Sequence, residues 1–156
     1  YVTRVGSGPF PTELNNDHGK YLRDQGNEYG STTGRPRRTG WLDLPALKYA
    51  VEINGVTQLM MMKADVLSGL NELKVCTEYE YGGETIKHIP FSLNDDLVTP
   101  VYTELKPWSE DLTKMNSTDQ LPNQLKSYTK FIEEYIGVPI VLISVGPDRE
   151  QTLWRV

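Results

Sequence analysis

The chain has 156 residues, of which 38% are hydrophobic and 24% charged, and its formal net charge is -5. This composition is typical of one folded domain with a hydrophobic core and argues against disorder. We find no apolar run near the ~20 residues of a membrane helix and no secretion signal, so we expect a cytoplasmic protein without a membrane partner. Because the balance is acidic, we expect a small anion rather than nucleic acid as the partner.

The metal-binding side chains are few and scattered along the sequence. Cys76 is the only cysteine, and it lies in an alternating pattern typical of a strand, where we expect a small buried or half-buried side chain. His18 and His88 lack the spacing of zinc ligands relative to it. We therefore expect no metal site in this chain.

The segment 30–43 places three arginines, at positions 35, 37 and 38, between glycines. Guanidinium groups match the oxygens of carboxylates and phosphates in pairs, and glycines let a backbone come close to a ligand. The segment therefore has the chemistry of an anion clamp. It also suits a solvated basic loop that pairs with surface acids, and composition leaves both interpretations open.

A helix is predicted to follow Asp43, whose side chain can cap it, and to end at Asn54 before Gly55. Apolar residues recur at helical spacing between these limits. The short apolar run 58–62 comes next and is predicted as a strand buried on both faces in a parallel sheet. Residues 63–65, with the sequence Lys-Ala-Asp, lie at the end of this strand.

A β-hairpin is predicted in the middle of the chain. Apolar residues alternate from Leu73 to Tyr81, and two glycines at 82 and 83 separate this run from a second one at 84–89. The sheet is therefore mixed, or a hairpin projects from it.

The last third begins with a predicted surface excursion over 90–120, which is rich in polar residues and prolines, with Tyr102 and Trp108 as anchors. Apolar residues at helical spacing then predict a helix ending at position 136. Residues 138–143 are predicted as another buried strand, and it leads into the turn 144–146.

Together these elements predict an α/β fold with a mixed, partly parallel sheet, flanking helices and a projecting β-hairpin, in a single domain over 1–156. Ligands of open α/β sheets bind beyond the carboxyl ends of the strands. Both 63–65 and 144–146 lie at such ends. The two segments are therefore candidates for one binding site.

A carboxylate at a strand end can accept two adjacent hydrogen bonds, and N1–H and N2–H of guanine offer two donors in that arrangement. Asp65 could receive them, and backbone amides of 144–146 could donate to O6. Lys63, two residues earlier, would point the same way as Asp65 in an extended backbone and could lie along the base. An exposed ion pair between Lys63 and Asp65 is the alternative interpretation.

Three longer segments resemble the adenylosuccinate synthetases. They are VGSGPFPTEL at 5–14, GNEYGSTTGRPRRTGWLD at 26–43 and SVGPDR at 144–149. The segments 63–70, 100–102 and 108–110 follow the family's order as well. Motifs of this length rarely arise by chance, and the resemblance covers nearly the whole chain.

The resemblance implies an enzyme that ligates IMP and L-aspartate to adenylosuccinate with GTP, through 6-phosphoryl-IMP, in AMP biosynthesis. It implies a fold related to the GTPases in its guanine site and a homodimer for the full-length enzyme. It also implies that this chain is only the C-terminal portion of that enzyme. A start at Tyr1 rather than methionine fits this expectation.

The resemblance also assigns the binding residues. For aspartate and IMP it implies Ser31, Thr32, Thr33, Gly34, Arg35 and Arg37, with Arg35 also facing IMP. For GTP it implies Arg37, Lys63, Ala64, Asp65, Ser144, Val145 and Gly146. Many members carry threonine and leucine where this chain has Met62 and Ala64, which changes the packing beneath the base.

Several parts of the family's catalytic apparatus are missing from this sequence. We find no glycine-rich phosphate loop and no counterpart of the family's catalytic aspartate and histidine, and His18 and His88 do not replace the latter. We therefore expect no catalytic residue and no Mg²⁺ ligand here, with both in the absent N-terminal part, and an isolated fragment that is inactive. A non-catalytic module that binds GTP or another anion is the alternative function.

Overall fold

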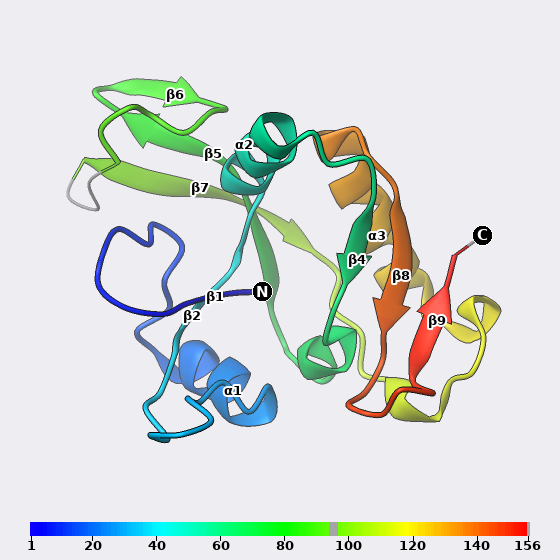
Figure 1. Ribbon diagram of the computed structural model, residues 1–156. Helices are drawn as coiled ribbons and strands as arrows, with labels where there is room; N and C mark the ends of the chain where they lie inside the picture. The colour runs from blue at the N-terminus through cyan, green and yellow to red at the C-terminus, as the bar shows by residue number, and fades with distance from the viewer. Residues whose placement is uncertain (94–96, 156) are drawn as a thin grey trace. The chain divides into compact units, whose positions relative to one another are not determined.

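The computed structural model describes residues 1–93 and 97–155 and consists of two compact units (Figure 1). The first unit comprises residues 1–49 and 74–103, and the second comprises 50–73 and 104–156. Parallel and antiparallel pairing both occur, so the predicted mixed α/β class is confirmed. No helix within the described ranges combines the length and the apolar character needed to cross a membrane.

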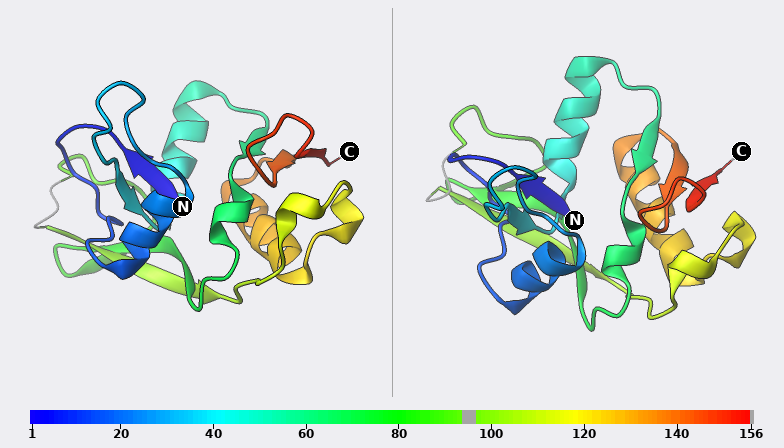
Figure 2. Two further views of the ribbon diagram at one scale, coloured as in Figure 1. Left: turned by 90° about the horizontal axis from the view of Figure 1, so that it is seen from below. Right: turned by 60° about the horizontal axis from the view of Figure 1, so that its bottom comes forward.

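The first unit starts with a small layer that the sequence analysis missed. Strand β1 (Val2–Arg4) pairs antiparallel with β2 (Arg38–Gly40), and helix α1 (Asp17–Gln25) packs along β2 (Figure 2). Gly40 is required where β2 passes the segment before α1, because a Cβ there would lie 2.3 Å from the carbonyl oxygen of Thr12. Strands of three residues carry too little periodicity to be recognised in a sequence.

The main sheet of this unit is built around β5 (Leu73–Tyr81). Strand β3 (Leu42–Asp43) is parallel to it, and β6 (Glu84–Ile86) is antiparallel, which confirms the predicted hairpin with a shorter second strand. The fourth strand, β7 (Val98–Leu105), also pairs with β5.

Strand β7 corrects the prediction of a continuous surface excursion over 90–120. Prolines and polar residues in this region predicted a loop, but an edge position tolerates Pro100 and polar side chains that face solvent. Residues 94–96 of the predicted excursion lie outside the described residues. Trp108 is buried, and its indole donates to Ser68 Oγ at 3.0 Å, so it does anchor the segment.

Asp43 joins the sheet to helix α2 (Leu44–Asn54). Its Oδ1 accepts from the amide of Ala46 at 3.0 Å, which confirms the predicted cap, and from the hydroxyl of Tyr79 at 2.6 Å. Burial raises the pKa of the Asp43 carboxyl, and the bond from Tyr79 opposes that rise. Cys76 lies on the same strand as Tyr79, fully buried as expected, and burial raises the pKa of its thiol to about 12.

The second unit contains a sheet of β4 (Leu59–Met61), β8 (Ile140–Ser144) and β9 (Thr152–Trp154). Strands β4 and β8 are parallel, as predicted, and β9 is antiparallel to β8 (Figure 1). The prediction that 58–62 is buried on both faces is wrong, because Met60 and Met62 are 59% and 61% exposed. Strand β4 has only β8 as a neighbour among the described strands, so its apolar run is partly uncovered.

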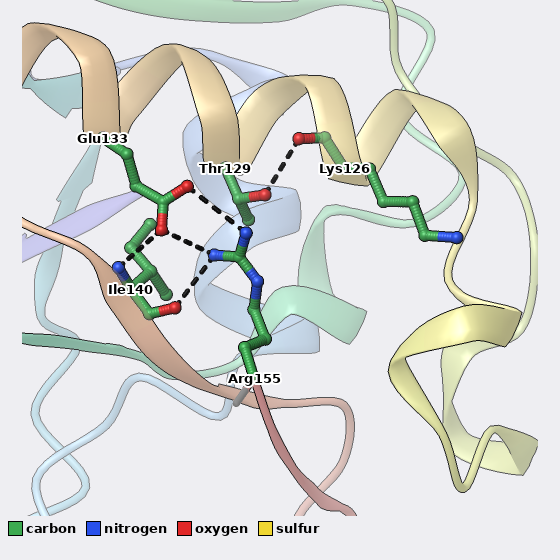
Figure 3. A network of polar contacts seen from close by, with 5 residues as sticks. All are labelled: Lys126, Thr129, Glu133, Ile140 and Arg155. Carbon is green, nitrogen blue, oxygen red and sulfur yellow. Dashed lines mark hydrogen bonds and ion pairs between the residues drawn. The ribbon is translucent and has the colours of Figure 1, made fainter.

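Helix α3 (Asn123–Ile136) is confirmed, and Gly137 ends it in the left-handed conformation at φ 86°. Figure 3 shows how the helix is tied to the sheet. The carboxylate of Glu133 accepts from the amide of Ile140 at 2.7 Å and from Arg155 at 2.8 and 3.3 Å. These bonds hold the start of β8. The unit also contains three short 3-10 helices, η1 (Ala64–Leu67), η2 (Leu112–Lys114) and η3 (Thr118–Gln120).

Tyr79→Phe should lower the free energy of unfolding by about 1–3 kcal/mol, because it removes a donor from a buried carboxylate. Urea denaturation measures this. Tyr81→Phe is the matched control on the same strand, since its hydroxyl bonds to no described residue, and it should change stability by less than about 0.5 kcal/mol. Equal effects of the two substitutions would contradict a stabilising role for the bond to Asp43.

Candidate functional site

The arginine loop, residues 30–37, is a closed turn between α1 and β2. The amide of Arg37 donates to the carbonyl oxygen of Glu28 at 2.9 Å, and that of Gly30 donates to Arg35 at 2.9 Å. The amide of Gly34 donates back to Gly30 at 2.8 Å, and Gly34 adopts φ 63°, which few other residues tolerate. Residues 31–36 at the tip are all exposed, so the predicted aspartate and IMP ligands from Ser31 to Arg35 face solvent.

The three arginines of the segment differ sharply in their surroundings. Arg35 is exposed, and its guanidinium bonds to none of the described residues. Arg37 is half-buried and pairs with the carboxylate of Glu28 at 2.8 Å. The loop therefore holds Arg37 in place and leaves Arg35 exposed. It has features both of a basic loop that pairs with acids and of an anion clamp.

Arg38 has a structural role that the sequence did not reveal. Its guanidinium pairs with both oxygens of Glu13, at 2.8 and 2.6 Å, and also donates to the carbonyl oxygen of Gly8 at 2.7 Å. It lies 5.4 Å from the centre of the Phe10 ring. Arg38 thus fastens the glycine-rich segment to β2 and is not a candidate ligand.

In the second unit, the predicted guanine residues do come together. Strands β4 and β8 are parallel neighbours, so 63–65 and 144–146 emerge at the same edge of the sheet. Helix η1, which contains Ala64 and Asp65, contacts β8 directly. The juxtaposition expected from the strand order is confirmed.

Asp65 is the unusual group at this edge. Its Oδ1 is buried, and it has no hydrogen-bond partner among the residues that the structure describes. Burial raises the pKa of the carboxyl, and the backbone N–H groups of Asp65 and Val66 together with the nearby charge of Lys63 oppose the rise. A buried oxygen without a donor is costly, so this atom is suited to receive N–H groups from a ligand.

Residues 144–146 form a tight turn braced by Gln151. The hydroxyl of Ser144 donates to the carbonyl oxygen of Gly146 at 3.0 Å. The amide of Val145 donates to the carbonyl oxygen of Gln151 at 2.8 Å. The Val145 amide is therefore unavailable to a base, whereas the Gly146 amide is still a candidate donor. A Cβ on Gly146 would lie 2.1 Å from Oε1 of Gln151, so a larger residue there would displace the end of that side chain.

Lys63 departs from the expected geometry. We predicted an extended backbone that points Lys63 and Asp65 the same way, but Lys63 adopts φ 59° and ψ 42° and helix η1 begins directly after it. The chain turns sharply as it leaves β4 and enters η1, which contacts β8, and the left-handed residue Lys63 makes this turn. The two residues are therefore not placed as in an extended strand.

Comparison with known proteins gives the family. The family profile described as adenylosuccinate synthetase matches residues 1–153. The chain belongs to the adenylosuccinate synthetase family. It is 63% identical over 155 residues to the adenylosuccinate synthetase of Flavobacterium johnsoniae and 61% identical to that of Flavobacterium psychrophilum. These alignments cover 99% of this chain but 37% of each relative, so it spans little more than a third of their length.

A solved structure agrees with the sequence comparison. Fully ligated adenylosuccinate synthetase from Plasmodium falciparum matches with a TM-score of 0.95 and 44% identity, over 100% of this chain and 38% of that one. The α/β fold is thus that of the adenylosuccinate synthetase family. The assignment of individual binding residues, and the meeting of the arginine loop with the guanine residues, stay predictions.

The sequence analysis missed the partners of the arginines, Glu13 and Glu28. Both lie within the motifs that carried the resemblance, so their presence was visible but their role was not. A charge that pairs 25 positions away leaves no local signal, because the pairing is set by the return of the chain along β2.

Arg38→Met should lower the free energy of unfolding by about 1–3 kcal/mol, because it leaves the half-buried Glu13 carboxylate without its partner. Arg35→Met, at an exposed position of the neighbouring arginine loop, should change the free energy of unfolding by less than about 0.5 kcal/mol. Urea denaturation of both variants compares them directly. An equal loss in both would contradict the assignment of Arg38 as the structural arginine.

Proposed function

We propose that this chain is part of an enzyme that ligates IMP and L-aspartate to adenylosuccinate with hydrolysis of GTP. GTP phosphorylates O6 of IMP, and the amine of aspartate then displaces phosphate from the 6-phosphoryl-IMP intermediate. Family membership and the coverage of residues 1–153 support this reaction class. The isolated chain is expected to be inactive, because it spans 37% of the length of its relatives.

The observation that carries the guanine assignment is the buried Oδ1 of Asp65, which lacks a donor among the described residues. Guanine offers N1–H and N2–H side by side, whereas adenine has an acceptor at N1. Gly146 is placed at the same sheet edge, where its amide could donate to O6. Lys63, Ala64, Ser144 and Val145 shape the surroundings of the base in this proposal.

The arginine loop serves the anionic substrates. Its exposed tip offers the hydroxyls and amides of Ser31, Thr32 and Thr33, and Gly34, whose amide donates to Gly30, is proposed to shape the turn that presents them. Arg35 is proposed to bind the aspartate carboxylates and IMP, and Arg37 the same substrates and GTP, because guanidinium forks pair with carboxylate and phosphate oxygens.

The metal chemistry is proposed to belong to a part of the enzyme outside this chain. Among residues 1–93 and 97–155, no three His, Cys, Asp or Glu side chains are grouped so as to hold a metal ion. We propose that the Mg²⁺ required with GTP is held by residues outside this chain.

From the family resemblance we also propose that the full-length enzyme is a homodimer.

The reaction is tested on the full-length protein that contains this sequence. Incubation with GTP, IMP, L-aspartate and Mg²⁺ should yield adenylosuccinate, GDP and phosphate in equal amounts, as measured by chromatography. Calorimetric titration of the 156-residue chain with GTP and Mg²⁺ should give weak binding at best, because other parts hold the phosphates. Tight binding by this chain without any turnover of the full-length protein would instead favour a non-catalytic GTP-binding module.

Asp65→Asn should raise the KM for GTP by at least about 100-fold, because the amide donates where the carboxylate accepted. The same variant should begin to use xanthosine triphosphate, whose base has a carbonyl at the position of the guanine amino group. Steady-state kinetics with both nucleotides measure the change. Unchanged nucleotide preference would remove Asp65 from the base site.

A further inference from the structure

Glu28 is the most deeply buried charged side chain near the arginine loop. The residue is 3% exposed, yet its two carboxylate oxygens have separate partners. Oε1 accepts from the hydroxyl of Tyr1 at 2.7 Å, and Oε2 accepts from Nη1 of Arg37 at 2.8 Å. Burying a carboxylate costs free energy unless other groups bond to it. The groups that bond to Glu28 therefore indicate which parts of the fold it holds in place.

The backbone around Glu28 holds the same arginine. The amide of Arg37 donates to the carbonyl oxygen of Glu28 at 2.9 Å, and Nε of Arg23 donates to the carbonyl oxygen of Arg37 at 2.8 Å. Arg37 is thus fixed at its amide, its carbonyl and one guanidinium nitrogen. Because Glu28 contacts that guanidinium at a single nitrogen and the side chain is 37% exposed, other N–H groups can still reach a ligand.

Arg35 shows what the loop looks like without such a partner. It is two residues away on the same turn, it is exposed, and its guanidinium bonds to none of the described residues. A long flexible side chain loses about 1–2 kcal/mol of rotamer freedom when it is ordered. The Arg37 side chain is already ordered in the folded protein, whereas the Arg35 side chain would lose its rotamer freedom only when a ligand binds.

We propose that Glu28 is a positioning residue, which presets the guanidinium of Arg37 for the anionic substrate while Arg35 is recruited only when the ligand arrives. The inference rests on the proposed function for the identity of that substrate, GTP. It is opposed to a simpler role in which Glu28 merely neutralises Arg37. The two roles predict opposite changes in the KM for GTP when the charge of Glu28 is removed. Loss of a positioning contact would raise the KM, whereas loss of a neutralising charge would strengthen anion binding and lower it.

The test is Glu28→Gln in the full-length enzyme, which keeps the size of the side chain and removes its charge. We expect the KM for GTP to rise about tenfold, with kcat changed by less than about threefold, because the guanidinium is no longer preset. In an Arg37→Lys background the same substitution should add nothing to the KM, since the two residues act as a unit. A fall in KM, an unchanged KM or additive effects would overturn the proposal.

Glu13→Gln is the matched control, because Glu13 pairs with the neighbouring Arg38 in a structural contact. It should lower the melting temperature and leave the KM for GTP within about twofold. An equal rise in KM from Glu13→Gln would show that any broken ion pair disturbs the loop. If Glu28→Gln does not fold, Tyr1→Phe removes the other bond to Glu28 and should raise the KM by about twofold to threefold.

Amide hydrogen exchange separates this inference from the proposed reaction. In Glu28→Gln the amides of Gly30, Gly34 and Arg37 should exchange faster than in Glu13→Gln, whatever the enzyme catalyses. If wild-type protein makes no adenylosuccinate but this difference is present, the reaction is wrong and the positioning of Arg37 stands. Equal exchange in the two variants would overturn the positioning itself.

Discussion

A carboxylate removed from water must receive hydrogen bonds, and this requirement organises both units of the chain. Asp43 takes a helix amide and the Tyr79 hydroxyl, Glu28 takes Arg37 and Tyr1, and Glu133 takes Arg155 and the amide of Ile140. Each of these groups joins elements that are distant in sequence. Asp65 departs from this rule at Oδ1 within the described residues, and that departure marks the proposed base site.

The same principle separates three adjacent arginines that look equivalent in the sequence. Arg38 is fully engaged by Glu13 and the glycine-rich segment, Arg37 is partly engaged by Glu28, and Arg35 is exposed. A basic cluster is therefore not one functional unit. The amount of acid packed against each guanidinium decides whether it holds the fold or remains able to bind a ligand.

The candidate base site lies at one edge of the sheet of β4, β8 and β9 because of the chain topology. Parallel strands β4 and β8 end at the same edge of this sheet. Residues 63–65 and 144–146, which are far apart in the sequence, therefore lie close together. The left-handed turn at Lys63 and the turn at 144–146, which bonds to Gln151, shape the backbone at this edge. This arrangement supports a binding site that is formed by backbone and one carboxylate, rather than by a cluster of side chains.

Local patterns determined much of the chain in advance. The helices over Leu44–Asn54 and Asn123–Ile136, the hairpin at Gly82 and the strand-end placement of Asp65 all follow from periodicity, caps and turns, which act within a few residues. The long motifs determined the family. These features need no knowledge of what lies across the fold.

Only the tertiary structure decided which charges meet. The pairing of Glu28 with Arg37, the structural role of Arg38 and the exposure of Met60 at a sheet edge depend on contacts between distant segments. Strand β7 also escaped prediction, because pairing with β5 outweighed its polar, proline-containing sequence. Burial and electrostatic pairing are properties of the folded arrangement, so no local pattern encodes them.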